Sequence, residues 1–220
     1  MSRPTLTAQI DACSATLSPE SLDDWRIVVY KLQENHAEAS KNSARYGGLL
    51  ILAWATFYSV GIGIVTEGQV SSLKFPNPKM LLIAAPPLLG LLFYLWSSAM
   101  NSANLLALAF SESFKCILPE MYKRNLEYLL LSPSIWTVET VLEKEAEEAW
   151  INRFQDAWRD GLMIAAVIGS FAAVIHLSTV LWRVNVYHPA SVTISVLVGL
   201  VLWLRGFVMA RVANRMRNDP

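Results

Sequence analysis

The sequence predicts an all-α fold: an integral membrane protein with four transmembrane helices in two hairpins and with cytoplasmic helical extensions. Four long apolar runs lead to this class, at residues 46–66, 80–98, 162–182 and 190–210. A helix needs roughly 20 apolar residues to cross the hydrocarbon core of a bilayer. No Asp or Glu lies within the runs, and the hydrophobic share of 54% exceeds the roughly 45–50% usual in soluble domains.

The distribution of Lys and Arg predicts which side of the membrane each segment occupies. Basic residues gather before the first run, between the second and third runs and after the fourth, and few lie in the two short connections. Because cytoplasmic loops carry the excess of Lys and Arg, both termini and the central segment are predicted to be cytoplasmic. The predicted parts are an N-terminal helix, a first transmembrane hairpin, a helical module, a second transmembrane hairpin and a tail, at residues 1–45, 46–98, 99–160, 161–211 and 212–220.

Three of the predicted membrane helices continue beyond the apolar runs. Ser18 and Pro19 form a good helix start, with a hydroxyl N-cap and proline at the first helical position. The helix that begins there is predicted to run into the first apolar run. The helix of the second run is predicted to continue to about Leu118, and residues 137–160 have the apolar spacing of an amphipathic helix that leads into the third run.

Two adjacent prolines, Pro86 and Pro87, lie within the second run. Proline lacks a backbone N–H, and its ring clashes with the preceding turn of a helix. Membrane helices tolerate proline when neighbouring helices satisfy the backbone groups that it leaves free. The sequence therefore predicts a kink in the part of this helix that lies away from the cytoplasm.

Small residues recur every four positions in three of the runs and form candidate packing ridges. Such ridges let membrane helices approach closely, because lipid provides no hydrophobic drive for helix association. Both packing within one subunit and contact between subunits are consistent with the spacing, and the second implies a homo-oligomer. The candidates are Ala55, Ser59 and Gly63, then Ala165, Gly169 and Ala173, and then Ser191, Ser195 and Gly199.

Four polar residues are candidates for lining a pore or sensing a signal. His176 lies deep in the third run, where it could titrate as a pH sensor or bond a neighbouring helix. Arg205 either extends its guanidinium to the interface or lines a vestibule that attracts anions or lipid headgroups. Asn101 and Asn104 follow the second run, where they could ring the mouth of an oligomer or face headgroups and cytoplasm.

Several functional classes have no motif in this sequence. There is no basic footprint for nucleic acid, no glycine-rich phosphate loop and no nucleophile elbow. Two cysteines and three dispersed histidines are too few to predict a metal site, and no cofactor is predicted. The only enzymatic candidate, and a loose one, is the cluster of glutamates within 143–148 together with His36. Without a recognised catalytic motif, the protein is predicted not to be an enzyme.

The layout resembles small bacterial membrane proteins of phage-defence systems, such as the Kiwa membrane subunit, membrane effectors of retrons and cyclic-nucleotide-triggered membrane effectors. The resemblance rests on the charged helices that lead into hairpins at residues 45–48 and 159–161, and on the cytoplasmic module at 99–160. It implies oligomeric assembly, disruption of the membrane or sensing of its disturbance, and a cytoplasmic protein partner. No site residue is implied by it.

These observations predict a non-enzymatic, oligomeric membrane protein that couples a cytoplasmic signal or partner to membrane packing or permeability. Membrane lipids and a cytoplasmic protein are the expected partners. A bacterial inner membrane is favoured by the size and layout of the chain and by the absence of an N-x-S/T sequon. A small ion channel or solute carrier and a membrane-bound scaffold remain alternatives, and a lipid-modifying enzyme ranks after them.

Overall fold

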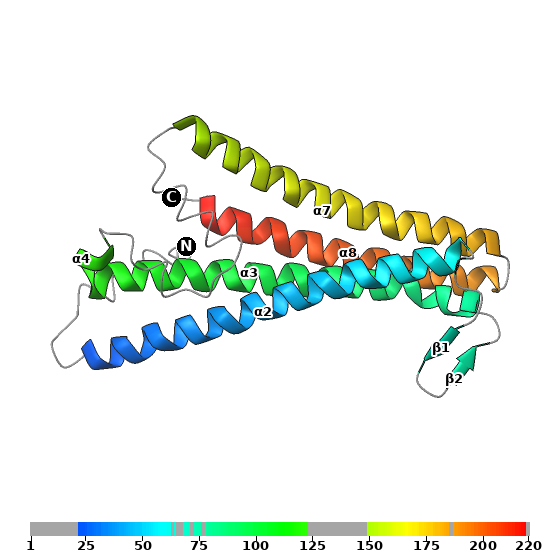
Figure 1. The fold of residues 1–220 in the computed structure, drawn as a ribbon, viewed down its shortest axis with the longest axis horizontal. Helices are drawn as coiled ribbons and strands as arrows, with labels where there is room; N and C mark the ends of the chain where they lie inside the picture. The colour runs from blue at the N-terminus through cyan, green and yellow to red at the C-terminus, as the bar shows by residue number, and fades with distance from the viewer. Residues whose placement is uncertain are drawn as a thin grey trace, which may run out of the picture. The chain divides into compact units, whose positions relative to one another are not determined.

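The computed structural model describes residues 22–62, 64, 68–70, 73–75, 78–122, 149–184 and 187–218, and these are mainly helical (Figure 1). The helical fold class is thereby confirmed. The structure also contains a short β-hairpin that the sequence did not predict. The elements in chain order are α2 (Leu22–Gly61), β1 (Gly68–Val70), β2 (Leu73–Phe75), the 3-10 helix η2 (Pro78–Ala84), α3 (Ala85–Ile117), α4 (Pro119–Tyr122), α7 (Ala149–Val184) and α8 (Pro189–Asn218).

Two helical segments among the described residues are long and apolar enough to cross a bilayer, Lys79–Ile117 and Pro189–Met209. They contain the second apolar run of the sequence and all but the last residue of the fourth. The third run is represented by a shorter apolar segment, Val167–Arg183. Residues 46–61 of the first run form the last part of α2, which ends at Gly61, before the run itself ends at residue 66.

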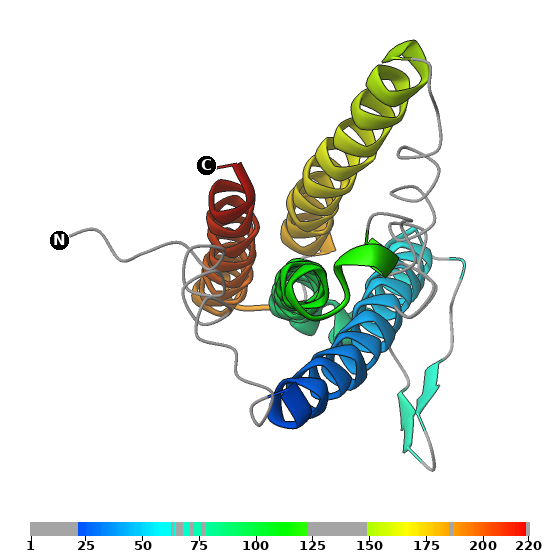
Figure 2. The same cartoon turned by 90° about the vertical axis from the view of Figure 1, so that its left-hand side faces the viewer.

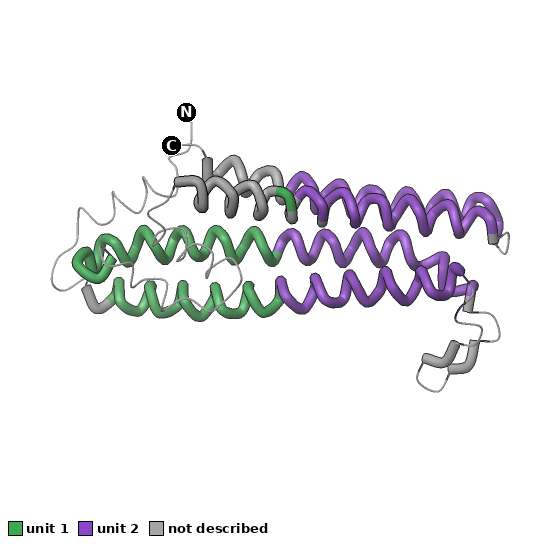
Figure 3. Tube along the Cα trace, turned by 45° about the horizontal axis from the view of Figure 1, so that its top comes forward, with its two compact units in different colours: residues 1–42, 99–161, 212–220 green, residues 43–98, 162–211 purple. Residues whose placement is uncertain are grey.

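The chain divides into two compact units (Figure 3). Unit 1 comprises residues 1–42, 99–161 and 212–220, and unit 2 comprises residues 43–98 and 162–211. These limits lie close to the boundaries drawn from the sequence between hydrophilic and apolar parts. The assignment of the parts to cytoplasm and membrane stays a prediction.

The described core of unit 1 lies between the N-terminal part of α2 and the C-terminal part of α3. Phe110 and Phe114, one helical turn apart on α3, are fully buried, and their rings stack with centroids 5.7 Å apart. Val29 and Leu32 of α2 pack against this pair. The α3 helix ends at Ile117, just before the predicted end, and α4 begins at Pro119, where proline needs no helical N–H partner.

Unit 2 contains helical segments of α2, α3, α7 and α8. Figure 2, which looks along the helices, shows α3 beside the other three. The core contains two clusters of buried apolar side chains. One is formed by Val60, Leu82, Leu181 and Val192, and the other by Ala85, Leu89, Val174 and Leu177.

The two strands of unit 2 form an antiparallel hairpin between α2 and η2. The paired residues are Gly68 with Phe75, Gln69 with Lys74 and Val70 with Leu73. The sequence predicts only a short outer connection in this region. The backbone pairing of three residues on each strand gives that connection regular structure.

The kink predicted at Pro86 and Pro87 is replaced by a change of helix type. The 3-10 helix η2 ends at Ala84 and α3 begins at Ala85, so both prolines lie in the first turn of α3. A missing N–H in the first turn removes no bond of the helix interior. The Ile83 carbonyl would bond residue 86 in a 3-10 helix or residue 87 in an α-helix, and it instead accepts a hydrogen bond from Ser195 Oγ of α8.

Candidate functional site

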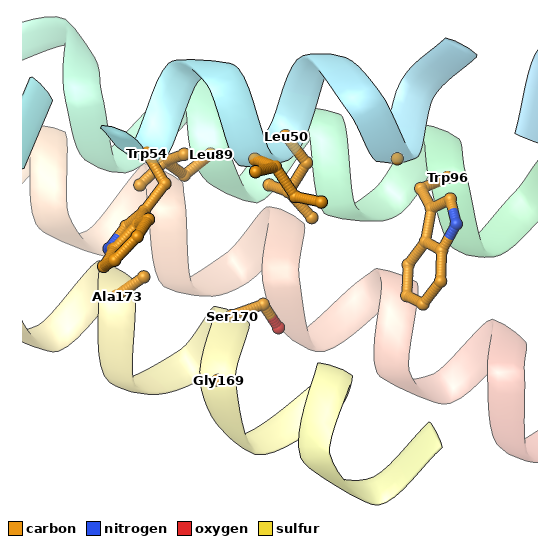
Figure 4. A pocket seen from close by; sticks show the side chains of 9 residues that line it. Leu50, Trp54, Leu89, Trp96, Gly169, Ser170 and Ala173 are labelled. Atoms are coloured by element: carbon orange, nitrogen blue, oxygen red, sulfur yellow. The ribbon is translucent and has the colours of Figure 1, made fainter. Parts of the chain in front are cut away.

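An apolar cavity of about 490 Å³ lies within unit 2 (Figure 4). Its volume falls in the range of about 300–1,000 Å³ typical of small-molecule sites. Figure 4 shows Trp54 and Trp96 at its opposite ends, with α2 and α7 along its sides. The lining residues come from three helices: Gly47, Leu50, Ile51 and Trp54 of α2, Leu89 and Trp96 of α3, and Gly169, Ser170 and Ala173 of α7.

The cavity has a buried floor and an exposed rim. Leu89 of α3 is only 1% exposed and belongs to the core, whereas Ile51 of α2 is 69% exposed. Gly169 on α7 is also exposed, and a Cβ added there would meet nothing within 4 Å. The cavity therefore opens sideways between α2 and α7, and the missing side chain at Gly169 contributes to its width.

The Ser170 hydroxyl is engaged by groups of the protein itself. Ser170 Oγ accepts a hydrogen bond from Trp203 Nε1 at 2.9 Å and donates one to the Val167 carbonyl oxygen at 2.9 Å. The other lining side chains are hydrocarbon or indole. A water molecule in a protein cavity needs about two to four polar partners, so this arrangement suits an apolar ligand group.

An aromatic contact lies beside the Trp54 end of the cavity and contains His176. The rings of Trp54 and Tyr58 stack with centroids 5.5 Å apart, and the His176 ring lies 5.6 Å from that of Tyr58. His176 is exposed on α7. The structure thus places this histidine against α2, and its role as a pH sensor stays a prediction.

The contact between α3 and α8 is closer than the contact between α2 and α7 at the cavity. A Cβ at Gly90 would overlap the carbonyl oxygen of Gly199, and a Cβ at Gly199 would lie 2.6 Å from the carbonyl oxygen of Pro86. Further along, Ser97 Oγ donates a hydrogen bond of 2.8 Å to the Gly206 carbonyl oxygen. Two members of the fourth-run ridge, Ser195 and Gly199, therefore pack within one chain.

Replacing Ser195 with alanine is expected to destabilise this contact. The change leaves the Ile83 carbonyl without its donor, and the prolines that follow it supply none. Interhelical hydrogen bonds in membrane proteins contribute on average about 0.6 kcal/mol and at most about 1.7 kcal/mol. We expect a loss near the upper value, measured by thermal unfolding in detergent. Ser191→Ala is the control because Ser191 is exposed one turn away, and equal losses for the two variants would contradict the prediction.

The remaining small-residue candidates are less closely packed within the chain. Ala55 is exposed and Ser59 is half-buried, with Ser59 Oγ donating to the Ala55 carbonyl oxygen at 2.8 Å. Gly63 lies outside the described residues. Ala165 is exposed, as is Ser191. In the third-run ridge, Gly169 and Ala173 both line the cavity. Contact of the first-run ridge with another subunit stays a prediction.

The structure does not gather the polar candidates into one site. Asn101 is 8% exposed in unit 1, and its Nδ2 has no hydrogen-bond partner in the part of the chain that the structure describes. Asn104 is exposed in the same unit. Arg205 is exposed in unit 2, with its guanidinium carbon 5.4 Å from the Tyr94 ring centroid, a cation–π geometry.

His36 is a buried histidine in unit 1. It is 3% exposed, its Nε2 lies 3.5 Å from the Ser40 hydroxyl, and its Nδ1 has no partner among the described residues. Burial lowers its pKa below the ordinary value of 6.5, because a charged imidazolium would lose its hydration. The glutamates at 143–148 proposed to act with it lie outside the described residues.

This depressed pKa predicts that acid destabilises unit 1. The unfolded chain binds a proton at pH 6.5 more readily than the folded chain does. The stabilisation is therefore complete above that pH and is lost as the pH falls through 6.5 toward the folded pKa. We expect His36→Gln to flatten this fall in the unfolding temperature. An equally steep fall in that variant would contradict the prediction.

The described residues contain no group of three or more His, Cys, Asp or Glu side chains that could hold a metal ion. Sequence reasoning also missed the residues that shape the two helix contacts. Gly90 and Gly206 were not selected, although they lie on the faces of α3 and α8 that meet. The place of Trp54 and Trp96 at the cavity depends on helix pairing that spacing alone does not reveal.

Comparison with known proteins gives no relative from which a site could be transferred. No protein-family model, curated protein or solved structure matches the chain. The resemblance in layout to phage-defence membrane proteins therefore stays a prediction. The geometry of the two units is the remaining basis for assigning a function.

Proposed function

We propose that this protein is a non-enzymatic, oligomeric protein of a bacterial inner membrane that crosses the bilayer four times and couples a cytoplasmic event to membrane packing or permeability. Large apolar side chains that are exposed along unit 2 support the four crossings. They include Leu52 of α2, Ile164 and Ile168 of α7 and Val201 of α8, each more than half exposed. Soluble proteins rarely expose apolar surface continuously, whereas a lipid-facing surface requires it.

The continuity of α2 is the observation that carries the proposal of coupling. This helix runs unbroken from Leu22 to Gly61. Within unit 1 its residues Val29 and Leu32 pack on the phenylalanine pair of α3, and within unit 2 its residues Leu50 and Trp54 line the cavity. A continuous helix that takes part in both units can transmit a displacement between them.

The unequal packing within unit 2 indicates which helix contact would change when α2 is displaced. The backbones of α3 and α8 meet at glycines, so a shift of one helix against the other would lose close-packed contacts. By contrast, α2 and α7 are separated along part of their length by the cavity. We infer that binding of a protein partner at the hydrophilic part of α2 changes the α2–α7 contact. An antiviral-defence sensor or effector, as the layout suggests, would work in this way.

Fusion reporters test the proposed topology. Alkaline phosphatase is active only outside the cytoplasm. Green fluorescent protein, in contrast, fluoresces when it stays in the cytoplasm. We expect phosphatase activity from fusions in the 65–77 and 185–188 connections, and fluorescence from fusions at either terminus and at residue 130. Phosphatase activity at the termini would overturn the proposed orientation.

Dye release from liposomes tests the proposed output. The purified protein is reconstituted, its oligomeric mass is determined in the same preparation, and release is recorded with and without a cytoplasmic extract. Release that depends on the extract supports coupling to a partner. Sustained ion transport by the purified protein alone would favour the small-channel alternative, and partner binding without any release would favour the scaffold.

A further inference from the structure

The cavity between α2 and α7 needs an occupant that is apolar and abundant where unit 2 resides. Its hydroxyl group at Ser170 is already bonded to Trp203 and to the Val167 backbone. Water therefore finds too few polar partners to fill it. An empty cavity of about 490 Å³ would deprive its walls of dispersion contacts.

The form of the cavity matches a flexible hydrocarbon chain. It extends between Trp54 and Trp96, which stand at its two ends, and Leu89 closes its floor (Figure 4). Its rim is formed by exposed Ile51 and Gly169, so a chain can enter sideways between the helices. A polar ligand would leave its polar groups without hydrogen-bond partners in such a lining.

We propose that this cavity is a lateral binding site for one acyl chain of a membrane phospholipid. This inference rests on the proposed membrane location of unit 2. The exposed apolar side chains that flank the rim, Leu52 on α2 and Ile168 on α7, continue the lining outward onto the surface that would face lipid. The bilayer hydrocarbon and the cavity are then contiguous, and lipid chains are the occupant at hand.

The bound chain deepens the proposed function because it fills the space between α2 and α7. An acyl chain in this space separates the two helices at the cavity, and its departure lets them approach. A change in the packing of membrane lipids would then alter the same contact that a partner on α2 alters. Lipid chains are the class of ligand through which the protein would respond to its membrane.

Photocrosslinking of a lipid tests the site. The full-length protein is reconstituted in vesicles of phosphatidylethanolamine and phosphatidylglycerol that contain a phosphatidylethanolamine with a diazirine on one acyl chain. After illumination, labelled positions are mapped by mass spectrometry. In the unchanged protein we expect label to concentrate on Trp54 and Ala173 rather than on outward-facing Leu52, and equal labelling of the two groups overturns the proposal.

Gly169→Leu is the decisive variant, and Gly48→Leu is its matched control. Both glycines are exposed and helical with nothing within 4 Å of an added Cβ, and only Gly169 lines the cavity. Filling the cavity is expected to lower labelling of Trp54 and Ala173 about tenfold, equivalent to about 1.4 kcal/mol, with no change for Gly48→Leu. Gly169→Met, with a more flexible side chain, should act as Gly169→Leu does.

The other outcomes separate this inference from the proposed function. Unchanged labelling in Gly169→Leu overturns the lipid site. A change of oligomeric mass in that variant without a change in labelling also overturns it and assigns the cavity to a second copy of the chain. Failure of the unchanged protein to float with vesicles after alkaline extraction overturns the membrane location itself, whereas flotation without cavity labelling overturns only the lipid site.

Discussion

Replacing Gly90 with alanine is expected to lower the stability of unit 2 substantially. The added methyl group would overlap the backbone carbonyl of Gly199 on the facing helix, and no flexible side chain can move aside. The two helices must therefore separate, which also loosens the hydrogen bond from Ser97 to Gly206. Overpacking of this kind costs about 1–3 kcal/mol and occasionally more. In a chain of this length each kcal/mol lowers the unfolding temperature by roughly 2–4 °C, which circular dichroism in detergent would measure.

Gly48→Ala controls for the loss of a glycine from a helix of unit 2. Gly48 lies on α2 in the same unit, and an added Cβ there meets nothing within 4 Å. Because alanine has the higher helix propensity, we expect this variant to be neutral or slightly more stable. Equal behaviour of the two alanine variants would show that α3 and α8 do not meet at Gly90, and the close packing assigned to this contact would be wrong.

The helical class could be predicted from the sequence because apolar period and length are local properties. The runs at 80–98 and 190–210 lie in helices long enough to cross a bilayer. The effect of Pro86 and Pro87 could not be derived in the same way. Whether proline kinks a helix or begins one depends on the preceding residues, which form a 3-10 turn, and on a donor from Ser195 more than one hundred positions away.

The candidate site was predictable only in fragments. Regular spacing selected Gly169 and Ala173 as members of a packing ridge, and the structure places both at the cavity. The spacing records which residues share one helix face and carries no information on which helix they oppose. The partners Leu50 and Trp54 come from α2, more than one hundred residues earlier, so the void between the helices has no sequence signal.

The phenylalanine pair of unit 1 gives the second large prediction. Phe110 is fully buried, stacks on Phe114 and contacts the α2 side chains Val29 and Leu32. Truncation of a buried phenylalanine costs about 3–5 kcal/mol, from lost burial and from the cavity left behind. Phe110→Ala is therefore expected to release residues 22–42 of α2 from α3. Amide hydrogen exchange in detergent would show this as much faster exchange of that segment.

Tyr30→Ala is the matched control, because this aromatic side chain lies on the same part of α2 and is 70% exposed. Its truncation should leave exchange nearly unchanged. The continuity of α2 also predicts an effect on function: if coupling passes along this helix, Phe110→Ala should abolish dye release that depends on the cytoplasmic extract, although the cavity in unit 2 is untouched. Faster exchange with unchanged release would show that the α2 contact in unit 1 does not carry the signal.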